Sequence, residues 1–183
     1  MQTTAIILAG GKSKRMGTDK ALLKVGGTAL LEKSVALCKT VCNHIIISSN
    51  NTEHDKYGYP LVADEIENCG PMGGIYSSLK KSETEWNFII SVDSAYVEPE
   101  FVSFLFSQAG DFDAIVPFSS NGREPLIALY NKQSLPVIEE NLNTGNFRVN
   151  NLLNAINTKW IDAESWIEKY PKLFYNLNRP EDL

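Results

Sequence analysis

The chain alternates short apolar runs with amphipathic stretches. Apolar runs at residues 5–9, 44–50 and 86–92 have the length and continuity of strands that are covered on both faces. Stretches 28–41 and 100–108 instead repeat their apolar residues at helical spacing. This alternation predicts a three-layer, Rossmann-like α/β fold with a mostly parallel twisted sheet and helices on both of its faces.

The second half of the chain continues the pattern less regularly. Residues 113–118 and 125–130 are predicted strands on either side of a polar loop, and 134–141 is a predicted helix. Residues 160–162 have the composition of an edge strand. One strand late in the chain is expected to run antiparallel, and Thr28 is expected to cap the first helix.

The first strand ends in a glycine pair that is followed by a concentration of positive charge. Gly10 and Gly11 let the backbone turn sharply and bring its N–H groups close to a ligand. Only Asp19 opposes the four cations of residues 12–20, which are Lys12, Lys14, Arg15 and Lys20. Such a loop suits a polyphosphate, and a solvated basic turn is the alternative. Neither a Walker loop nor a dinucleotide-binding fingerprint is present.

Polar residues follow two further predicted strands. Ligands of open parallel sheets bind beyond the carboxyl ends of the strands, so Ser48 and Asn50 should lie near Gly10 if their strands are neighbours. A short strand at 61–63 precedes Asp64, a carboxylate that is able to accept hydrogen bonds from the N–H groups of a base, guanine in particular. The alternative role of Asp64 is that of a loop cap.

A second carboxylate, Asp93, ends the strand at 86–92. A carboxylate at a strand end beside a phosphate-binding loop can hold Mg²⁺ while nucleotide phosphates complete the coordination. Mg²⁺ is therefore the expected cofactor, and Asp93 is its expected protein ligand. His44 and His54 have no partners at the spacing of metal ligands, so neither is expected to bind a metal or to act in catalysis.

Composition narrows the class of protein. The 183 residues suit a single domain over 1–183, and 43% of them are hydrophobic, which is enough for a core. The net charge of −5 and the confinement of cations to one loop argue against a nucleic-acid binder. No apolar run approaches the length of a membrane span, and three cysteines without a secretory leader favour reduced thiols. A cytoplasmic enzyme is expected.

Beyond these physical patterns, the segment LAGGKSKRMGTDKALL resembles the signature of the molybdenum cofactor guanylyltransferases, the MobA-like nucleotidyltransferases. The resemblance continues along the chain in family order. Asp64 begins a D-x-x-x-x-x-GP-x-GG-I segment, residues 125–130 resemble P-L-x-A-L-Y, and the tail resembles F-x-N-x-N-T-P-E-D-L. Val92 and Ala95 depart from the family's metal segment, where cysteine and proline are usual.

The resemblance implies transfer of GMP from GTP to the phosphate of a molybdopterin cofactor, with release of pyrophosphate. Leu8, Ala9 and Gly10 would then face the base and ribose, and residues 11–15 would surround the β- and γ-phosphates. Lys20 would bridge the α- and β-phosphates, Asp64 would bind guanine, and Asp93 would hold Mg²⁺. The implied catalytic residues are Arg15, Lys20 and Asp93, and the implied acceptor-binding residues are Arg123, Arg148 and Asn178.

Two alternatives share much of this pattern. A CTP-dependent nucleotidyltransferase for a pterin, a sugar phosphate or an isoprenoid precursor would use the same glycine loop and metal aspartate and would differ in base selection. A non-catalytic nucleotide-binding adaptor would keep the fold without the reaction. The expected partners are GTP and the molybdopterin cofactor, with transient contact to proteins that deliver or accept that cofactor.

Overall fold

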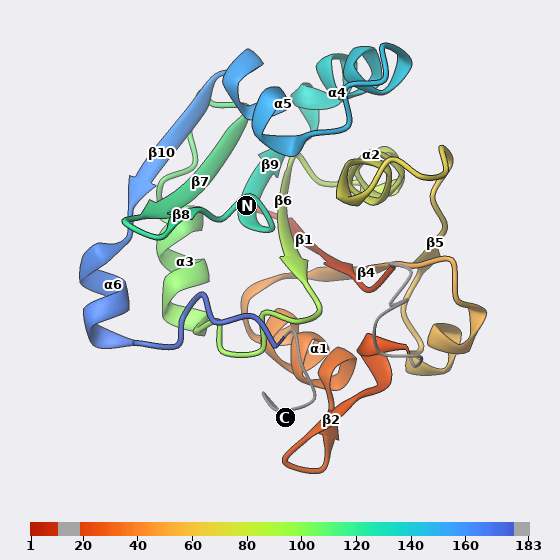
Figure 1. The fold of residues 1–183 in the computed structure, drawn as a ribbon, viewed down its shortest axis with the longest axis vertical. Helices are drawn as coiled ribbons and strands as arrows, with labels where there is room; N and C mark the ends of the chain where they lie inside the picture. Colours follow the sequence, from red (N-terminus) through yellow and green to blue (C-terminus); the bar gives the residue numbers. More distant parts are fainter. Residues whose placement is uncertain (11–18, 178–183) are drawn as a thin grey trace.

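The computed structural model describes residues 1–10 and 19–177. Its main sheet has the strand order β10-β7-β9-β6-β1-β4-β5, and β8 pairs with β7 (Figure 1). The strands are β1 (Thr3–Leu8), β4 (His44–Ser48), β5 (Leu61–Val62), β6 (Trp86–Ser91), β7 (Ala114–Ser119), β8 (Gly122–Arg123), β9 (Ile127–Asn131) and β10 (Thr158–Asp162). Strand β9 runs antiparallel to β6 and β7, and the other pairs along this order are parallel. The mostly parallel sheet with a late antiparallel strand is confirmed.

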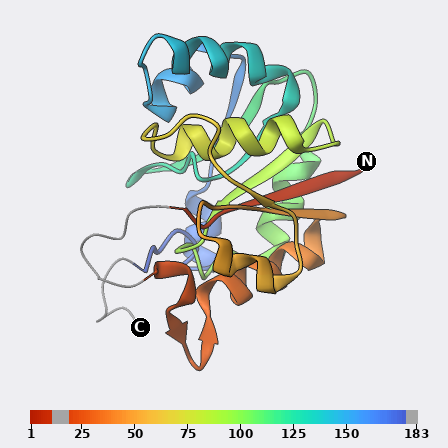
Figure 2. The same cartoon turned by 90° about the vertical axis from the view of Figure 1, so that its right-hand side faces the viewer.

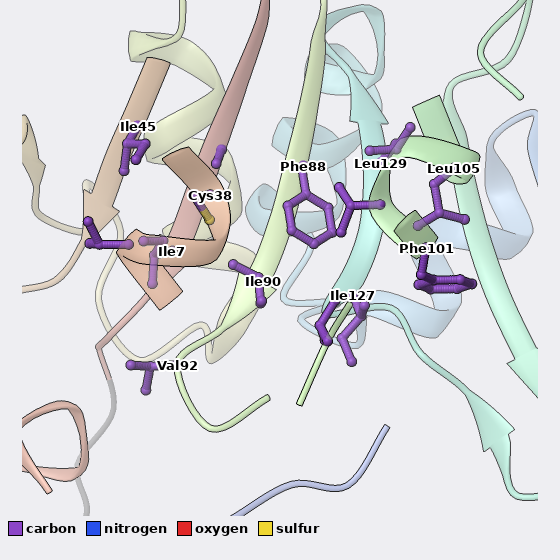
Figure 3. Close-up of a cluster of buried hydrophobic side chains, with 14 of the residues drawn as sticks. Ile7, Cys38, Ile45, Phe88, Ile90, Val92, Phe101, Leu105, Ile127 and Leu129 are labelled. Atoms are coloured by element: carbon purple, nitrogen blue, oxygen red, sulfur yellow. The ribbon is translucent and has the colours of Figure 1, made fainter. Parts of the chain in front are cut away.

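Helices cover both faces of the sheet, as Figure 2 shows. One layer contains α1 (Leu30–Val41), α3 (Pro99–Ser107) and α6 (Glu164–Lys169), and the other contains α2 (Pro71–Lys81), α4 (Leu135–Asn143) and α5 (Val149–Ala155). Successive side chains of a strand point to opposite faces, so Ile7 joins the core on the α1 side and Ile6 the core on the α2 side. Figure 3 shows the first core, where Ile7 and Phe88 face Cys38 and Phe101. None of the described helices is long and apolar enough to cross a membrane.

The first predicted helix begins later than expected. Residues 28 and 29 form β3 (Thr28–Ala29), which pairs with β2 (Lys24–Val25), so Thr28 is not a helix cap. Gly26 and Gly27 have φ values of 62° and 85°, and positive φ at both central residues is what a two-residue hairpin turn requires. The helix α1 begins at Leu30, and Glu32 Oε2 accepts a hydrogen bond from Ala29 N at 3.1 Å.

The late elements match their predictions with shifted ends. The predicted strands at 113–118 and 125–130 correspond to β7 and β9, and the polar loop between them contains the additional short strand β8. Strand β10 lies at the edge of the sheet, as predicted. Short 3₁₀ helices complete the described chain: η1 (Lys20–Leu22), η2 (Thr52–Tyr57) and η3 (Lys132–Ser134).

Candidate active site

A cavity of about 810 Å³ opens where the carboxyl ends of β1 and β4 lie side by side. Leu8 stands opposite Ser48 in the sheet, and Ala9 N donates to Ser48 O at 3.0 Å. The structure therefore brings together the residues predicted at these strand ends. The lining includes Leu8, Ala9, Gly10, Asp19, Ser48, Ser49, Asn50, Asn51, Asp64, Gly70, Pro71, Gly74 and Ser91. Gly11 and Arg15, which were also predicted for this site, lie outside the described residues.

Asp64 faces this cavity from the loop that follows β5. Its backbone N donates to Asn50 Oδ1 at 2.9 Å, which joins the loop to the end of β4. Burial raises the pKa of the Asp64 carboxyl, Asn50 lowers it in part by hydrogen bonding, and nearby Glu67 raises it further. A partly buried carboxylate at this place is an acceptor for N–H donors of a bound ligand.

Two glycines allow α2 to pack directly against the floor of the cavity. A Cβ on Gly74 would lie 2.5 Å from Ser48 Oγ and 3.5 Å from Asp64 Oδ1. A Cβ on Gly73 would lie 2.9 Å from the backbone O of Ile66. Larger residues would push the helix away from the strand ends, so the spacing of the Gly-Pro-x-Gly-Gly segment shapes this wall of the cavity.

Lys20 and Asp93 form an ion pair. Lys20 Nζ lies 2.6 Å from Asp93 Oδ2, and both side chains are less than one-fifth exposed. Ser91 Oγ donates to Asp93 Oδ1 at 2.5 Å. Both carboxylate oxygens therefore have partners, and Asp93 is held at the end of β6 with a defined orientation.

A smaller cavity of about 180 Å³ has Asp93 in its lining. It shares Ser91 and Leu126 with the main cavity, and its lining comprises Ser91, Asp93, Ser94, Glu124, Pro125, Leu126, Ile127 and Asn176. Burial raises the pKa of Glu124 to about 7. Ser94 Oγ donates to Asn176 Oδ1 at 2.9 Å, which ties the tail of the described chain to the loop after β6.

Glu124 and Asn176 are not among the residues predicted for the site. Strand β9 is antiparallel to β6, so its amino end lies at the same edge of the sheet as the carboxyl end of β6. Ser91 N donates to Leu126 O at 3.0 Å at this junction. Residues that precede an antiparallel strand lie at the same edge of the sheet as residues that follow parallel strands. The predicted late antiparallel strand was therefore the sequence signal that could have pointed to Glu124.

The residues around Asp93 fit a magnesium ion that arrives with a nucleotide. The described part of the chain has no group of three His, Cys, Asp or Glu side chains that could hold a metal alone. Mg²⁺ in nucleotide-transferring sites is commonly bound by one or two carboxylates together with substrate phosphates. One oriented carboxylate, Asp93 in the lining of the smaller cavity, meets that requirement, provided that Lys20 moves off Oδ2.

The acceptor-side predictions fall at other places. Arg123 is exposed on β8, donates to Asn154 Oδ1 at 3.0 Å and lies 4.2 Å above the centre of the Trp160 ring. Arg148 is exposed at the start of α5. Neither arginine lines the two cavities. Asn178 lies outside the described residues.

One further position differs from what its sequence suggested. His54, which stands among polar residues in the sequence, lies in η2 with its side chain fully buried. Its Nε2 is 3.0 Å from Asp19 Oδ2. His44 is exposed, and its Nε2 lies 3.1 Å from Gln2 Oε1.

Known proteins resemble the whole chain. A protein from Thermococcus gammatolerans named "Probable molybdenum cofactor guanylyltransferase" is 35% identical over 97% of this chain and 95% of its own length. The "Molybdenum cofactor guanylyltransferase" of Vibrio parahaemolyticus is 31% identical over 100% of this chain and 93% of its own. The crystal structure of molybdopterin-guanine dinucleotide biosynthesis protein A from Archaeoglobus fulgidus has the same fold, with a TM-score of 0.84 and 21% identity over 98% of this chain and 94% of that one. Residues 5–159 match the family described as "MobA-like NTP transferase domain", and the chain belongs to that family.

Proposed function

We propose that this nucleotidyltransferase moves GMP from GTP to the phosphate of a molybdopterin cofactor and releases pyrophosphate, with Mg²⁺ as its cofactor. The names of its relatives support the reaction. The observation that carries the proposal is the arrangement of two cavities that meet at Ser91 and Leu126, with Asp93 at the smaller one and Lys20 paired to it. A donor nucleotide in the larger cavity and an acceptor in the smaller would present their phosphates to each other at this junction.

Guanine recognition is assigned to Asp64. Guanine carries adjacent N1–H and N2–H donors, which a single carboxylate is able to accept together. Adenine and cytosine do not present that pair of donors, so either base would leave the partly buried Asp64 carboxylate without its partners at a cost of about 1–3 kcal/mol. Leu8, Ala9 and Gly10 line the same cavity and would offer backbone groups to the base and ribose.

Transfer requires positioning and charge stabilisation rather than a protein nucleophile. An oxygen of the acceptor phosphate forms a bond to the α-phosphorus of GTP while the bond from that phosphorus to the bridging oxygen breaks, and pyrophosphate carries away the electron pair. Lys20 would leave Asp93 and bind the α- and β-phosphate oxygens, where negative charge develops. Asp93 would hold Mg²⁺, which supplies further charge neutralisation when bound.

The acceptor is assigned to the smaller cavity and its surroundings. Ser94 and Asn176 present polar groups there, and Glu124 borders the same space. Arg123, Arg148 and Asn178 stay predictions for the acceptor side, and Arg15 and Gly11 stay predictions for the phosphates.

Calorimetry of nucleotide binding with Mg²⁺ tests the base assignment. GTP should bind at least about tenfold more tightly than CTP or ATP, which corresponds to the lower part of that energy range. Asp64→Asn should remove this preference, whereas Asp111→Asn, an exposed aspartate far along the chain, should keep it. Tighter binding of CTP would favour the CTP-dependent alternative.

Pyrophosphate release separates an enzyme from an adaptor. With GTP, Mg²⁺ and molybdopterin, the protein should release pyrophosphate in step with formation of the guanylylated cofactor. Tight GTP binding without acceptor-dependent pyrophosphate release would favour the non-catalytic adaptor.

A further inference from the structure

The buried imidazole of His54 has no evident structural need for its polarity. Its side chain is 0% exposed, and neither ring nitrogen makes a well-aligned hydrogen bond to any described residue. A buried polar group without such a bond costs about 1–3 kcal/mol. The charged atom that it reaches is Asp19 Oδ2, 3.0 Å from Nε2. The role of His54 therefore depends on the role of Asp19.

Both carboxylate oxygens of Asp19 accept hydrogen bonds. Its Oδ1 accepts from Ala21 N at 2.9 Å and so caps η1, while its Oδ2 accepts from Asn51 Nδ2 at 2.6 Å. Asn51 in turn caps η2, because its Oδ1 accepts from Glu53 N at 3.0 Å. The caps of two short helices are thus bonded to each other, and His54 contacts the same Asp19 oxygen from the first turn of η2.

The contacts of Asp19 with Asn51 and His54 lie next to the start of η1, which carries Lys20. Asp19 lines the main cavity, and η1 begins with Lys20, whose Nζ pairs with Asp93. A bare carboxylate at the rim would repel a polyphosphate, since two like charges 4 Å apart cost roughly 1 kcal/mol in water and about 4 kcal/mol near a protein surface. Polar partners on both oxygens reduce that repulsion and fix the backbone from which Lys20 extends.

We infer that His54 is a positioning residue for Lys20: together with Asn51 it holds the Asp19 carboxylate, and this sets the start of η1 and the reach of the lysine. The inference rests on the proposed role of Lys20 at the phosphates. It gives η2 a part in placing Lys20.

Kinetics of three histidine variants test this role. His54→Leu fills a similar volume without polar atoms, His54→Gln restores a polar group, and His44→Gln is the matched control at the chain's other histidine. His54→Leu should lower kcat about tenfold, because small misplacement of a catalytic group costs up to about 10²-fold. The KM for GTP should change less than twofold, His54→Gln should recover most of kcat, and His44→Gln should match the unmodified protein.

Coupling to Asp19 distinguishes positioning from packing. Asp19→Asn should lower kcat by itself, and adding His54→Leu to it should cause less than a further twofold loss, since the contact is already weakened. Full multiplication of the two losses, or a normal kcat in His54→Leu, would overturn the inference. Absence of acceptor-dependent pyrophosphate release in the unmodified protein would instead overturn the proposed function.

Nuclear magnetic resonance of the imidazole rings tests the contact even if His54→Leu does not fold. The chain has two histidines, so His44→Gln assigns both rings. In Asp19→Asn the ¹⁵Nε2 resonance of His54 should shift by more than that of His44. Unchanged His54 resonances would show that the imidazole does not sense Asp19, which also overturns the inference.

Discussion

The two cavities at the edge of the sheet are built in different ways. The larger lies at the carboxyl ends of β1 and β4, which are parallel neighbours, and its lining combines the glycines Gly10, Gly70 and Gly74 with polar side chains. The smaller lies where the carboxyl end of β6 meets the amino end of the antiparallel β9, and its lining contains no described glycine but has Asp93, Glu124 and Asn176. A reversal of one strand thus places a second, chemically distinct site beside the first.

This difference has a consequence for specificity. Parallel strand ends followed by glycines present N–H groups and room, which suit a nucleotide whose phosphates and base are fixed in kind. The antiparallel junction presents carboxyl, hydroxyl and amide groups whose identity can change without moving a strand. If the proposed placement holds, variation of the acceptor would be easier to accommodate in the smaller cavity than variation of the nucleotide in the larger one.

Loss of the Asp93 charge in the smaller cavity should have the largest effect. Asp93→Asn keeps the shape of the side chain and its contact with Ser91 but removes the charge that would hold Mg²⁺. Transfer should fall by on the order of 10³-fold, equivalent to several kcal/mol of lost charge stabilisation. Measured GTP affinity should be weaker and no longer depend on Mg²⁺. Full Mg²⁺-dependent activity would mean that another carboxylate, such as Asp64 or Glu65, holds the metal.

Removal of the lysine should separate its catalytic role from its pairing with Asp93. Lys20→Met should lower turnover by on the order of 10²-fold, since the ammonium acts where charge develops. The same variant should bind Mn²⁺, a spectroscopic substitute for Mg²⁺, up to about fivefold more tightly without nucleotide, because a partly exposed ion pair is worth up to about 1 kcal/mol. Electron paramagnetic resonance measures the free Mn²⁺. Weaker Mn²⁺ binding would show that Lys20 orients Asp93 for the metal rather than competing with it.

The lining of the larger cavity was largely predictable because its polar residues follow the chain order of the strands. Gly10 and Asp64 follow β1 and β5, Ser48 ends β4, and parallel pairing brings those strand ends together. Lys20 and Asp93 were also predicted as partners of one site, and they meet at 2.6 Å. Local sequence was sufficient here since each strand end carries its own polar residue.

The positions of Glu124, the β2–β3 hairpin and His54 depend on strand pairing and helix packing, which local sequence patterns do not reveal. Glu124 precedes β9, and its place beside Asp93 follows from the antiparallel register of β9 on β6. The hairpin of β2 and β3 was missed because the following helical pattern begins without a break, although Gly26-Gly27 is a recognised turn signal. His54 is buried by packing of η2, so its polar neighbours in sequence misrepresented its surroundings.

The packing of α2 beside the larger cavity should be sensitive to a single added methyl group at Gly73. Gly73→Ala would place Cβ 2.9 Å from the backbone O of Ile66, and a backbone atom cannot rotate away. The clash should outweigh the helix preference for alanine, which is worth up to about 1 kcal/mol, and lower the free energy of unfolding by about 1–2 kcal/mol. Chemical denaturation measures this change. Gly110→Ala, whose Cβ would meet only Phe112 atoms at 3.8 Å, is the matched control. Equal stability of the two variants would show that the Ile66 loop adjusts freely.

The smallest expected effect concerns the smaller cavity and pH. The raised pKa of Glu124, about 7, means that this carboxyl is mostly neutral below pH 7 and mostly charged above it. Charge on Glu124 would repel an acceptor phosphate that approaches Asp93, so the KM for the acceptor should rise about fivefold between pH 6 and pH 8, a change of roughly 1 kcal/mol.

The acceptor phosphate also titrates near pH 6, so the unmodified protein alone does not isolate Glu124. Glu124→Gln should flatten the rise, whereas Glu140→Gln, an exposed glutamate on α4, should leave it unchanged. A KM that falls with pH and loses this dependence in Glu124→Gln would instead show that the charged carboxylate accepts a hydrogen bond from the acceptor, which would make Glu124 a recognition group rather than a source of repulsion.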